Sequence, residues 1–203
     1  MTGRFVCYNG EGINQDGMMA IVAPDKLLTA EEYGELPDLG RPTELVRGRI
    51  VDMNVPYPRH GQVCARVSFL MQQYLIDNDL GHVIINDGGV IVERGPDTVR
   101  GPDVSFISYR KVPKGPLPAK YFEIAPELIF EVRSPSDRWG SVLQKVGEYL
   151  TAGTEVVCVI DPDSETVQLH FADKPTETLA GQEPLSFPNL LPGFQISIDR
   201  FFT

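Results

Sequence analysis

The sequence predicts an α/β fold in which a mixed central β-sheet is flanked by helices. Short apolar segments typical of strands recur along the chain, and two longer segments carry the 3.6-residue apolar period of amphipathic helices. In the second half, one of these helices lies between two apolar segments, an arrangement that predicts parallel neighbouring strands. The chain has 203 residues, 42% of them hydrophobic, and this is enough to bury one substantial core.

The chain divides into an extension and a single domain. Residues 1–25 contain four glycines and no sustained period, so we expect a loosely ordered extension with one short strand near 18–22. The domain is expected over residues 26–203, because the remaining segments follow one another without a linker or an internal repeat.

The helices are predicted from caps and periodicity. Thr29 and Glu32 have the spacing of a capping box and open a short helix. Apolar residues over 60–77 fall at i, i+4, i+7 and i+8, the stripe of an amphipathic helix. A third helix is expected to begin after Ser136 or Asp137, both good N-caps, and to end at Gly153.

The strands are predicted from alternation and from short apolar runs. Residues 128–132 form a nearly continuous apolar run, typical of a strand buried on both faces. Residues 43–53 predict two strands joined at Arg47-Gly48. The other strands are expected over 82–86, 90–93, 102–108, 155–160, 166–171, 177–179 and 194–198.

Charge is distributed unevenly along the chain. The net charge is −10, yet residues 41–145 hold 14 Lys/Arg against 12 Asp/Glu, whereas the other 98 residues hold 4 against 16. A net negative charge is unusual for a protein that binds nucleic acid, because phosphate binding rests on Lys and Arg. The middle of the chain can still form a locally positive cleft; the alternative is a solvated acidic surface that keeps the protein soluble.

Several classes of protein are disfavoured. No apolar run approaches the ~18 residues of a membrane span, and the N-terminus lacks the pattern of a secretory signal. Cys7, Cys64 and Cys158 are far apart and never spaced C-x-x-C, so neither a disulfide framework nor a cysteine zinc site is supported. We therefore expect a cytoplasmic protein with no membrane partner.

Two carboxylates at neighbouring strand ends carry the candidate chemistry. Glu131 ends an otherwise apolar strand, where an unpaired carboxylate is expensive unless a metal, a cation or a proton compensates it. Asp103 follows Pro102 at the start of another strand and is able to face Glu131. Converging carboxylates bind hard divalent cations through oxygen, with water and a substrate phosphate completing the shell.

A lysine on the third helix adds a cation to this group. On a helical wheel Lys145 lies just beyond the apolar arc of the helix and beside Tyr149. Its stem can follow the edge of the core and bring the ammonium toward Glu131. There the charge would orient a nucleophilic water or stabilise a phosphate oxyanion.

Several separated motifs, in this order, resemble the Uma2 (DUF820) family, a branch of the PD-(D/E)xK nuclease superfamily. The resemblance covers about residues 25–172. It is carried by Glu44 to Met53, by His60 and the apolar helix after it, by Gly101-Pro-Asp103-Val, by Pro126 to Asp137, by Lys145-x-x-x-Tyr149 and by Ala152-Gly to Asp161-Pro162.

The resemblance implies a restriction-endonuclease-like fold and a Mg²⁺- or Mn²⁺-dependent endonuclease. Asp103 and Glu131 are similar to the motif acids that bind the metal. The superfamily's E-x-K motif has a lysine at the position of Arg133, and the resemblance implies that Lys145 has taken over its role. Nucleic acid is the expected substrate, with DNA favoured over RNA on the resemblance alone.

Five further residues have more than one interpretation. Arg133 shares a strand face with Glu131 and is a candidate phosphate contact or a structural ion-pair partner of Glu131. Arg100 is a candidate for binding substrate or for pairing with Glu131, and Tyr149 for binding substrate, ordering Lys145 or packing. Glu44 is either an additional ligand or base, or a surface acid. For His60, a capping or packing role is favoured over proton transfer.

Two other classes of function compete with the nuclease. One is a nucleic-acid-binding or regulatory module that keeps the fold without cutting. The other is a structural protein that oligomerises through a sheet edge. Homodimerisation fits the nuclease interpretation, because cleavage of a duplex needs two sites.

Overall fold

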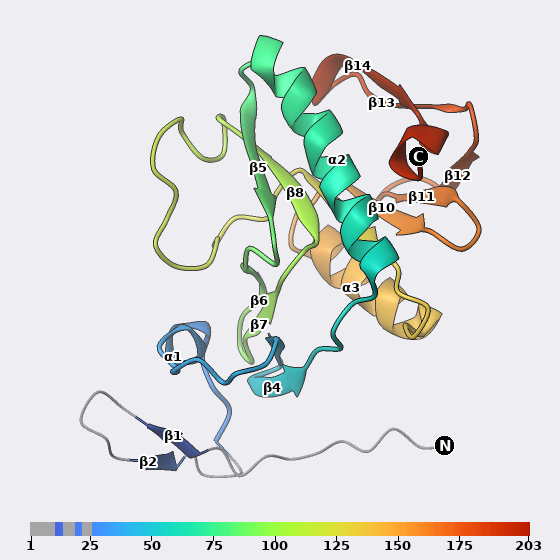
Figure 1. Ribbon diagram of the computed structural model, residues 1–203. Helices are drawn as coiled ribbons and strands as arrows, with labels where there is room; N and C mark the ends of the chain where they lie inside the picture. Colours follow the sequence, from blue (N-terminus) through green and yellow to red (C-terminus); the bar gives the residue numbers. More distant parts are fainter. Residues whose placement is uncertain (1–10, 14–18, 22–25) are drawn as a thin grey trace.

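The computed structural model describes residues 11–13, 19–21 and 26–203 (Figure 1). Strands β1 (Glu11–Ile13) and β2 (Met19–Ile21) form an antiparallel pair, and β2 matches the core of the strand expected near 18–22. The rest of the expected extension lies outside the described residues. The division of the chain into residues 1–25 and 26–203 stays a prediction.

A six-stranded mixed sheet forms the centre of the molecule (Figure 1). Strands β9 and β10 are parallel, as the β-α-β pattern predicts, and every other neighbouring pair is antiparallel. In spatial order the strands are β12 (Glu177–Ala180), β11 (Thr166–His170), β10 (Val156–Asp161), β9 (Leu128–Val132), β8 (Val104–Ser108) and β5 (Gly81–Ile85).

Two helices cover opposite faces of this sheet. Helix α2 (Pro58–Asp77) buries the stripe of Val63, Val67, Leu70 and Met71 against one face, as its period predicts. Helix α3 (Trp139–Thr151) packs against the other face. In Figure 1, α2 crosses in front of the sheet and α3 lies behind it. The sheet is thus the middle of three layers, which explains why β8 and β9 are buried throughout.

A second, antiparallel sheet carries the hairpin expected over 43–53. Its spatial order is β4 (Arg49–Asp52), β3 (Thr43–Val46), β7 (Thr98–Arg100) and β6 (Val90–Glu93). Arg47 and Gly48 both have positive φ angles, of 49° and 73°, as a two-residue hairpin turn requires. Short helix α1 (Ala30–Gly34) has the predicted capping box, formed by Thr29 and Glu32.

The C-terminal residues close the core on the side of α2. Strands β13 (Pro184–Phe187) and β14 (Leu191–Ser197) form a hairpin, and the short 3₁₀ helix η1 (Ile198–Phe201) follows. Leu185, Leu191, Ile198 and Phe201 are fully or almost fully buried in the same cluster as the apolar stripe of α2.

Two sequence-based expectations about these elements are wrong. The strand expected over 102–108 begins only at Val104, so Pro102 and Asp103 precede it. Helix α3 is capped by neither Ser136 nor Asp137: its N-cap residue is Arg138, which makes no side-chain capping bond. The Asp137 carboxylate instead accepts a 2.8 Å hydrogen bond from the Ser134 amide within the preceding turn. Strands β1, β7 and β13 have no counterpart among the expected strands.

In the part of the chain that the structure describes, no helix combines the length and the apolar character needed to cross a membrane.

Candidate active site

Asp103 and Glu131 meet at one end of the central sheet. Asp103 directly precedes Val104, the first residue of β8, and Val104 pairs with Phe130 of β9, so Asp103 lies beside Glu131 at the end of this strand pair. Asp103 Oδ2 accepts a 2.6 Å hydrogen bond from the amide of Val132, the residue after Glu131, and the Asp103 carboxylate acts electrostatically on Glu131. The structure thus brings together the two carboxylates that the sequence singled out.

Glu131 is a buried acid on the face covered by α3. The Tyr149 hydroxyl, itself fully buried, donates a 2.7 Å hydrogen bond to Glu131 Oε1. Burial, reinforced by the nearby Asp103 carboxylate, raises the pKa of Glu131 to about 8, although Lys145 and the Tyr149 hydroxyl act in the opposite direction. A positive charge at this point would therefore stabilise the ionised carboxylate.

Lys145 reaches the same group of side chains from α3. Its ammonium lies 3.0 Å from Glu44 Oε1, and only 18% of the side chain is exposed. Burial alone would lower the pKa of Lys145, but the Glu131 and Glu44 carboxylates outweigh it and raise the pKa above its ordinary value. Lys145 therefore acts as a permanent cation at neutral pH.

A buried ion network holds Glu44 in place. Arg100 donates from Nη1 to Glu44 Oε2 at 2.7 Å and binds Glu148 of α3 through Nε at 2.6 Å and Nη2 at 3.1 Å. The Gly101 amide also donates to Glu44, at 3.1 Å. Burial raises the pKa of Glu44, but Lys145 and Arg100 outweigh it, so the pKa is lowered overall. The interpretation of Glu44 as a surface acid is therefore wrong.

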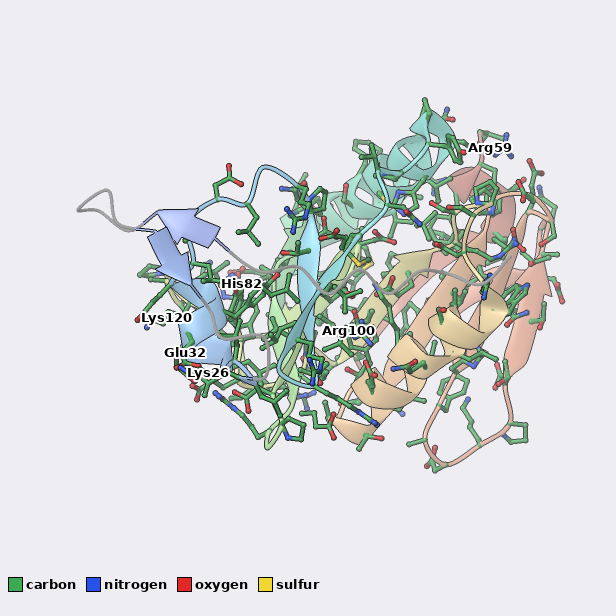
Figure 2. All side chains as sticks on the ribbon, turned by 90° about the horizontal axis from the view of Figure 1, so that it is seen from below. Lys26, Glu32, Arg59, His82, Arg100 and Lys120 are labelled. Atoms are coloured by element: carbon green, nitrogen blue, oxygen red, sulfur yellow. The ribbon has the colours of Figure 1, made fainter. Side chains whose placement is uncertain are left out.

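Arg100 lies inside the protein rather than on a substrate-facing surface. It is 6% exposed, and its guanidinium is bound to Glu44 and Glu148. In Figure 2 Arg100 lies in the middle of the molecule, whereas Arg59 and Lys120 lie toward its two ends. This burial favours a structural role for Arg100 over the substrate contact expected from the sequence, and its partners are Glu44 and Glu148, not Glu131.

His60 points into the site from the first turn of α2. Its Nε2 lies 3.2 Å from Asp103 Oδ2, and both side chains are largely buried. Burial lowers the pKa of His60, but its hydrogen bond to Asp103 outweighs this effect and raises the pKa above its ordinary value. The favoured expectation of capping or packing therefore overlooked the contact with Asp103.

Arg133 lies beside the site and is stacked on an aromatic ring. Its Nη1 is 3.0 Å from Asp161 Oδ2, and its guanidinium lies over the Trp139 ring at 5.1 Å from the centroid. The phosphate contact expected for Arg133 stays a prediction.

Three nearby residues were missed by sequence reasoning. Glu148 lies one helical turn after Lys145. Its role, the binding of Arg100, becomes visible only in the structure. Partial burial and the neighbouring Asp103 carboxylate raise the pKa of Asp87, and the Asn86-Asp87 pair has positive φ angles of 61° and 58°. Cys64, on α2, lies with its sulfur 3.5 Å from His60 Nδ1. For Asp87, the turn sequence Asn86-Asp-Gly-Gly89 is the one local signal that could have drawn attention to the residue.

Comparison with solved structures identifies the fold. The chain is similar to the crystal structure of "a putative nuclease belonging to DUF820" from Anabaena variabilis, with a TM-score of 0.75. The two are 21% identical, and the alignment covers 86% of this chain and 97% of the other. The fold is restriction-endonuclease-like, as the sequence motifs imply. No curated protein matches the sequence.

The sequence itself establishes the family. A family model described as "Uma2: Putative restriction endonuclease" matches residues 30–199, which is most of the chain. The chain belongs to the Uma2 family. Membership in this family supports a nuclease function.

Proposed function

We propose that this protein is a divalent-metal-dependent endonuclease that hydrolyses phosphodiester bonds, with DNA favoured over RNA. The observation that carries the proposal is the position of Asp103, directly before β8, beside Glu131 of β9, with the Lys145 cation nearby. Two carboxylates and one ammonium are the groups needed to bind a metal ion and to stabilise charge on a phosphate.

The donor set suits Mg²⁺ or Mn²⁺. Asp103 and Glu131 would hold the ion through carboxylate oxygens, the ligands that hard cations prefer. The raised pKa of Glu131 supports this assignment, because a buried carboxylate that resists ionisation gains most from a nearby cation. When bound, such an ion would polarise the phosphate and activate a water molecule.

The protein's own side chains supply the remaining functions. Lys145, held by Glu44, directs its ammonium to a water or to a phosphate oxyanion. His60 contacts Asp103 and positions this carboxylate. Tyr149 positions Glu131 through its hydroxyl and takes this role in place of a substrate contact.

Charge and stacking around the site support a nucleic-acid substrate. Arg133 lies two residues after Glu131, and Trp139, whose ring lies against the Arg133 guanidinium, is 37% exposed as a residue. A guanidinium recognises phosphate, and an exposed indole can stack on a base. Arg100, bound on both sides by Glu44 and Glu148, instead organises the site from within the protein.

A plasmid-nicking assay tests the proposal. Supercoiled plasmid is incubated with Mg²⁺ or Mn²⁺ and with wild type, Asp103→Asn or the control Asp173→Asn. Asp173 is exposed and follows the end of β11 that pairs with Val157, so it lies away from the Glu131 end of the sheet. We expect metal-dependent nicking by wild type and by the control, and none by Asp103→Asn.

A binding measurement separates the enzyme from the non-catalytic module. Trp139 is the single tryptophan of the sequence, so its fluorescence reports binding near Arg133. Binding without nicking in either metal, unchanged by Asp103→Asn, would establish the binding module instead. Single-stranded RNA and DNA oligonucleotides assayed in parallel decide the substrate preference, and light scattering on the protein–duplex complex tests the expected homodimer.

A further inference from the structure

Cys64 has no part in the proposed hydrolysis, yet it lies beside one of its carboxylates. His60 and Cys64 are four residues apart on α2 and therefore share a face of the helix. The Cys64 sulfur is 3.5 Å from His60 Nδ1, and His60 Nε2 is 3.2 Å from Asp103 Oδ2. Taking one ligand atom from each residue, all three atoms lie within 4.8 Å of one another.

Two of these three donors, Cys64 and His60, differ in chemistry from the carboxylate pair assigned to Mg²⁺. A thiolate and an imidazole are soft or borderline ligands that favour Zn²⁺, Co²⁺ or Cu²⁺, whereas Mg²⁺ prefers oxygen. Zn²⁺ commonly takes three protein ligands and leaves one position open. Ligand atoms around a tetrahedral Zn²⁺ lie roughly 3.5 Å apart, so modest side-chain rotations would bring this cluster to that spacing.

The surroundings of the cluster also favour a dication. The Cys64 thiol lies in the field of the Asp103, Glu131 and Asp87 carboxylates. Its side chain is only partly buried. Cys158, by contrast, is fully buried in the apolar core of the sheet. Among the residues that the structure describes, no other group of three His, Cys, Asp or Glu side chains meets the same distance criterion.

We propose that His60, Cys64 and Asp103 form a second metal site that binds Zn²⁺ and, by engaging Asp103, inhibits the metal-dependent hydrolysis. The inhibition rests on the proposed function, whereas the binding of Zn²⁺ does not. Binding converts the Cys64 thiol to a thiolate, and its proton is released to solvent. Because Asp103 belongs to both sites, Zn²⁺ and Mg²⁺ compete for one carboxylate.

Cobalt spectroscopy tests the site without reference to activity. Co²⁺ substitutes for Zn²⁺, and its bond to a thiolate gives a charge-transfer absorption that carboxylate or imidazole ligands do not give. We expect this band in wild type at one equivalent of Co²⁺, its displacement by Zn²⁺, and its loss in both Cys64→Ala and Cys64→Val. The matched control Cys7→Ser should keep the band.

Three further measurements check the fold of the variants, the binding of Zn²⁺ and the inhibition of cleavage. Circular dichroism verifies the fold of each variant, and thermal melts should show that Zn²⁺ raises the Tm of wild type but not that of Cys64→Ala. In plasmid nicking with Mg²⁺, Cys64→Ala should match wild type without Zn²⁺ and need at least ten times more Zn²⁺ for half-inhibition.

The outcomes distinguish the two proposals. Absence of the band in wild type, or its persistence in folded Cys64 variants, would overturn the metal site. A band with equal Zn²⁺ inhibition of wild type and Cys64→Ala would overturn the link between this site and inhibition. A chain that shows the band but cuts no nucleic acid would overturn the proposed function, and the inhibition with it, while the site itself stands.

Discussion

The Lys145 ammonium lies 3.0 Å from a Glu44 carboxylate oxygen and joins helix α3 to the β3–β4 hairpin. These residues are 101 positions apart, yet both side chains are largely buried. Glu44 therefore fixes the position of the cation, and Glu131 lies in the field of both groups. The first prediction follows from this arrangement.

Lys145→Met should abolish most cleavage while nucleic-acid binding is retained. Methionine keeps the length of the stem but removes the charge that acts on the phosphate or on the water. We expect kcat to fall about 10²–10³-fold, the usual effect of removing one preorganised electrostatic group. Lys120→Met, a change at an exposed lysine, is the control and should cut at the wild-type rate. Equal rates for both variants would contradict the role of Lys145.

Tyr149→Phe should weaken both the fold and the site. Phenylalanine keeps the buried ring but deprives Glu131 of a 2.7 Å hydrogen bond, with an expected loss of about 1–3 kcal/mol in the free energy of unfolding. This bond also lowers the pKa of Glu131, so the pH of half-maximal cleavage should rise in the variant. Urea denaturation and a pH–rate profile measure the two effects.

Tyr109→Phe is the matched control for this prediction. The Tyr109 hydroxyl donates to an exposed carboxylate, that of Asp79, at 2.9 Å. Its removal should leave stability and the pH profile almost unchanged. An unshifted profile in folded Tyr149→Phe would show that Tyr149 does not position Glu131.

Arg100→Gln should destabilise the protein far more than Arg59→Gln. Arg100 is buried between two carboxylates, and breaking such a network typically costs about 3–5 kcal/mol. Arg59 pairs with Glu165 at the surface, with both side chains more than half exposed, so its replacement should change stability by less than about 1 kcal/mol. Urea denaturation of both variants decides between a structural Arg100 and a substrate-binding one, which would leave stability intact.

Stability of the metal-free protein should fall as the pH rises toward 8. The pKa of Glu131 is raised from 4.5 to about 8, so the folded state holds this proton more tightly than the unfolded state does. The resulting stabilisation is complete below about pH 4.5 and is lost as the pH rises through 8. One proton corresponds to a slope of at most about 1.4 kcal/mol per pH unit.

The difference between wild type and Glu131→Gln isolates this contribution. His60 titrates in both proteins, so its effect largely cancels. In chelator, the free energy of unfolding of wild type should decline relative to the variant between pH 5 and 8. Saturating Mn²⁺ should remove the decline, because metal binding takes the place of the proton. Parallel curves in chelator would show that Glu131 has an ordinary pKa.

The central β-α-β unit was predictable because its signals are local. The apolar run of β9 and the apolar arc of α3 lie within one continuous segment, and Glu131 interrupts that pattern where the site forms. Helical spacing likewise placed Lys145 at the edge of the core. The positions of Glu131 and Lys145 could therefore be predicted from the sequence, because each depends on the pattern within a single strand or helix.

Contacts between distant segments were not predictable in the same way. Arg100 meets Glu44 and Glu148 across separations of 56 and 48 residues, and nothing in its own segment indicates that it is buried. Asp137 looked like an N-cap, but its carboxylate is used in the preceding turn by Ser134. Tertiary packing decides which of several neighbouring polar groups a side chain binds.

A crystal grown or soaked with Mn²⁺ and measured at an anomalous-scattering wavelength tests the central claim most directly. The account predicts one strong anomalous peak within bonding distance of carboxylate oxygens of both Asp103 and Glu131, with the Lys145 ammonium close by. A fully occupied Mn²⁺ that binds elsewhere and touches neither carboxylate would contradict it.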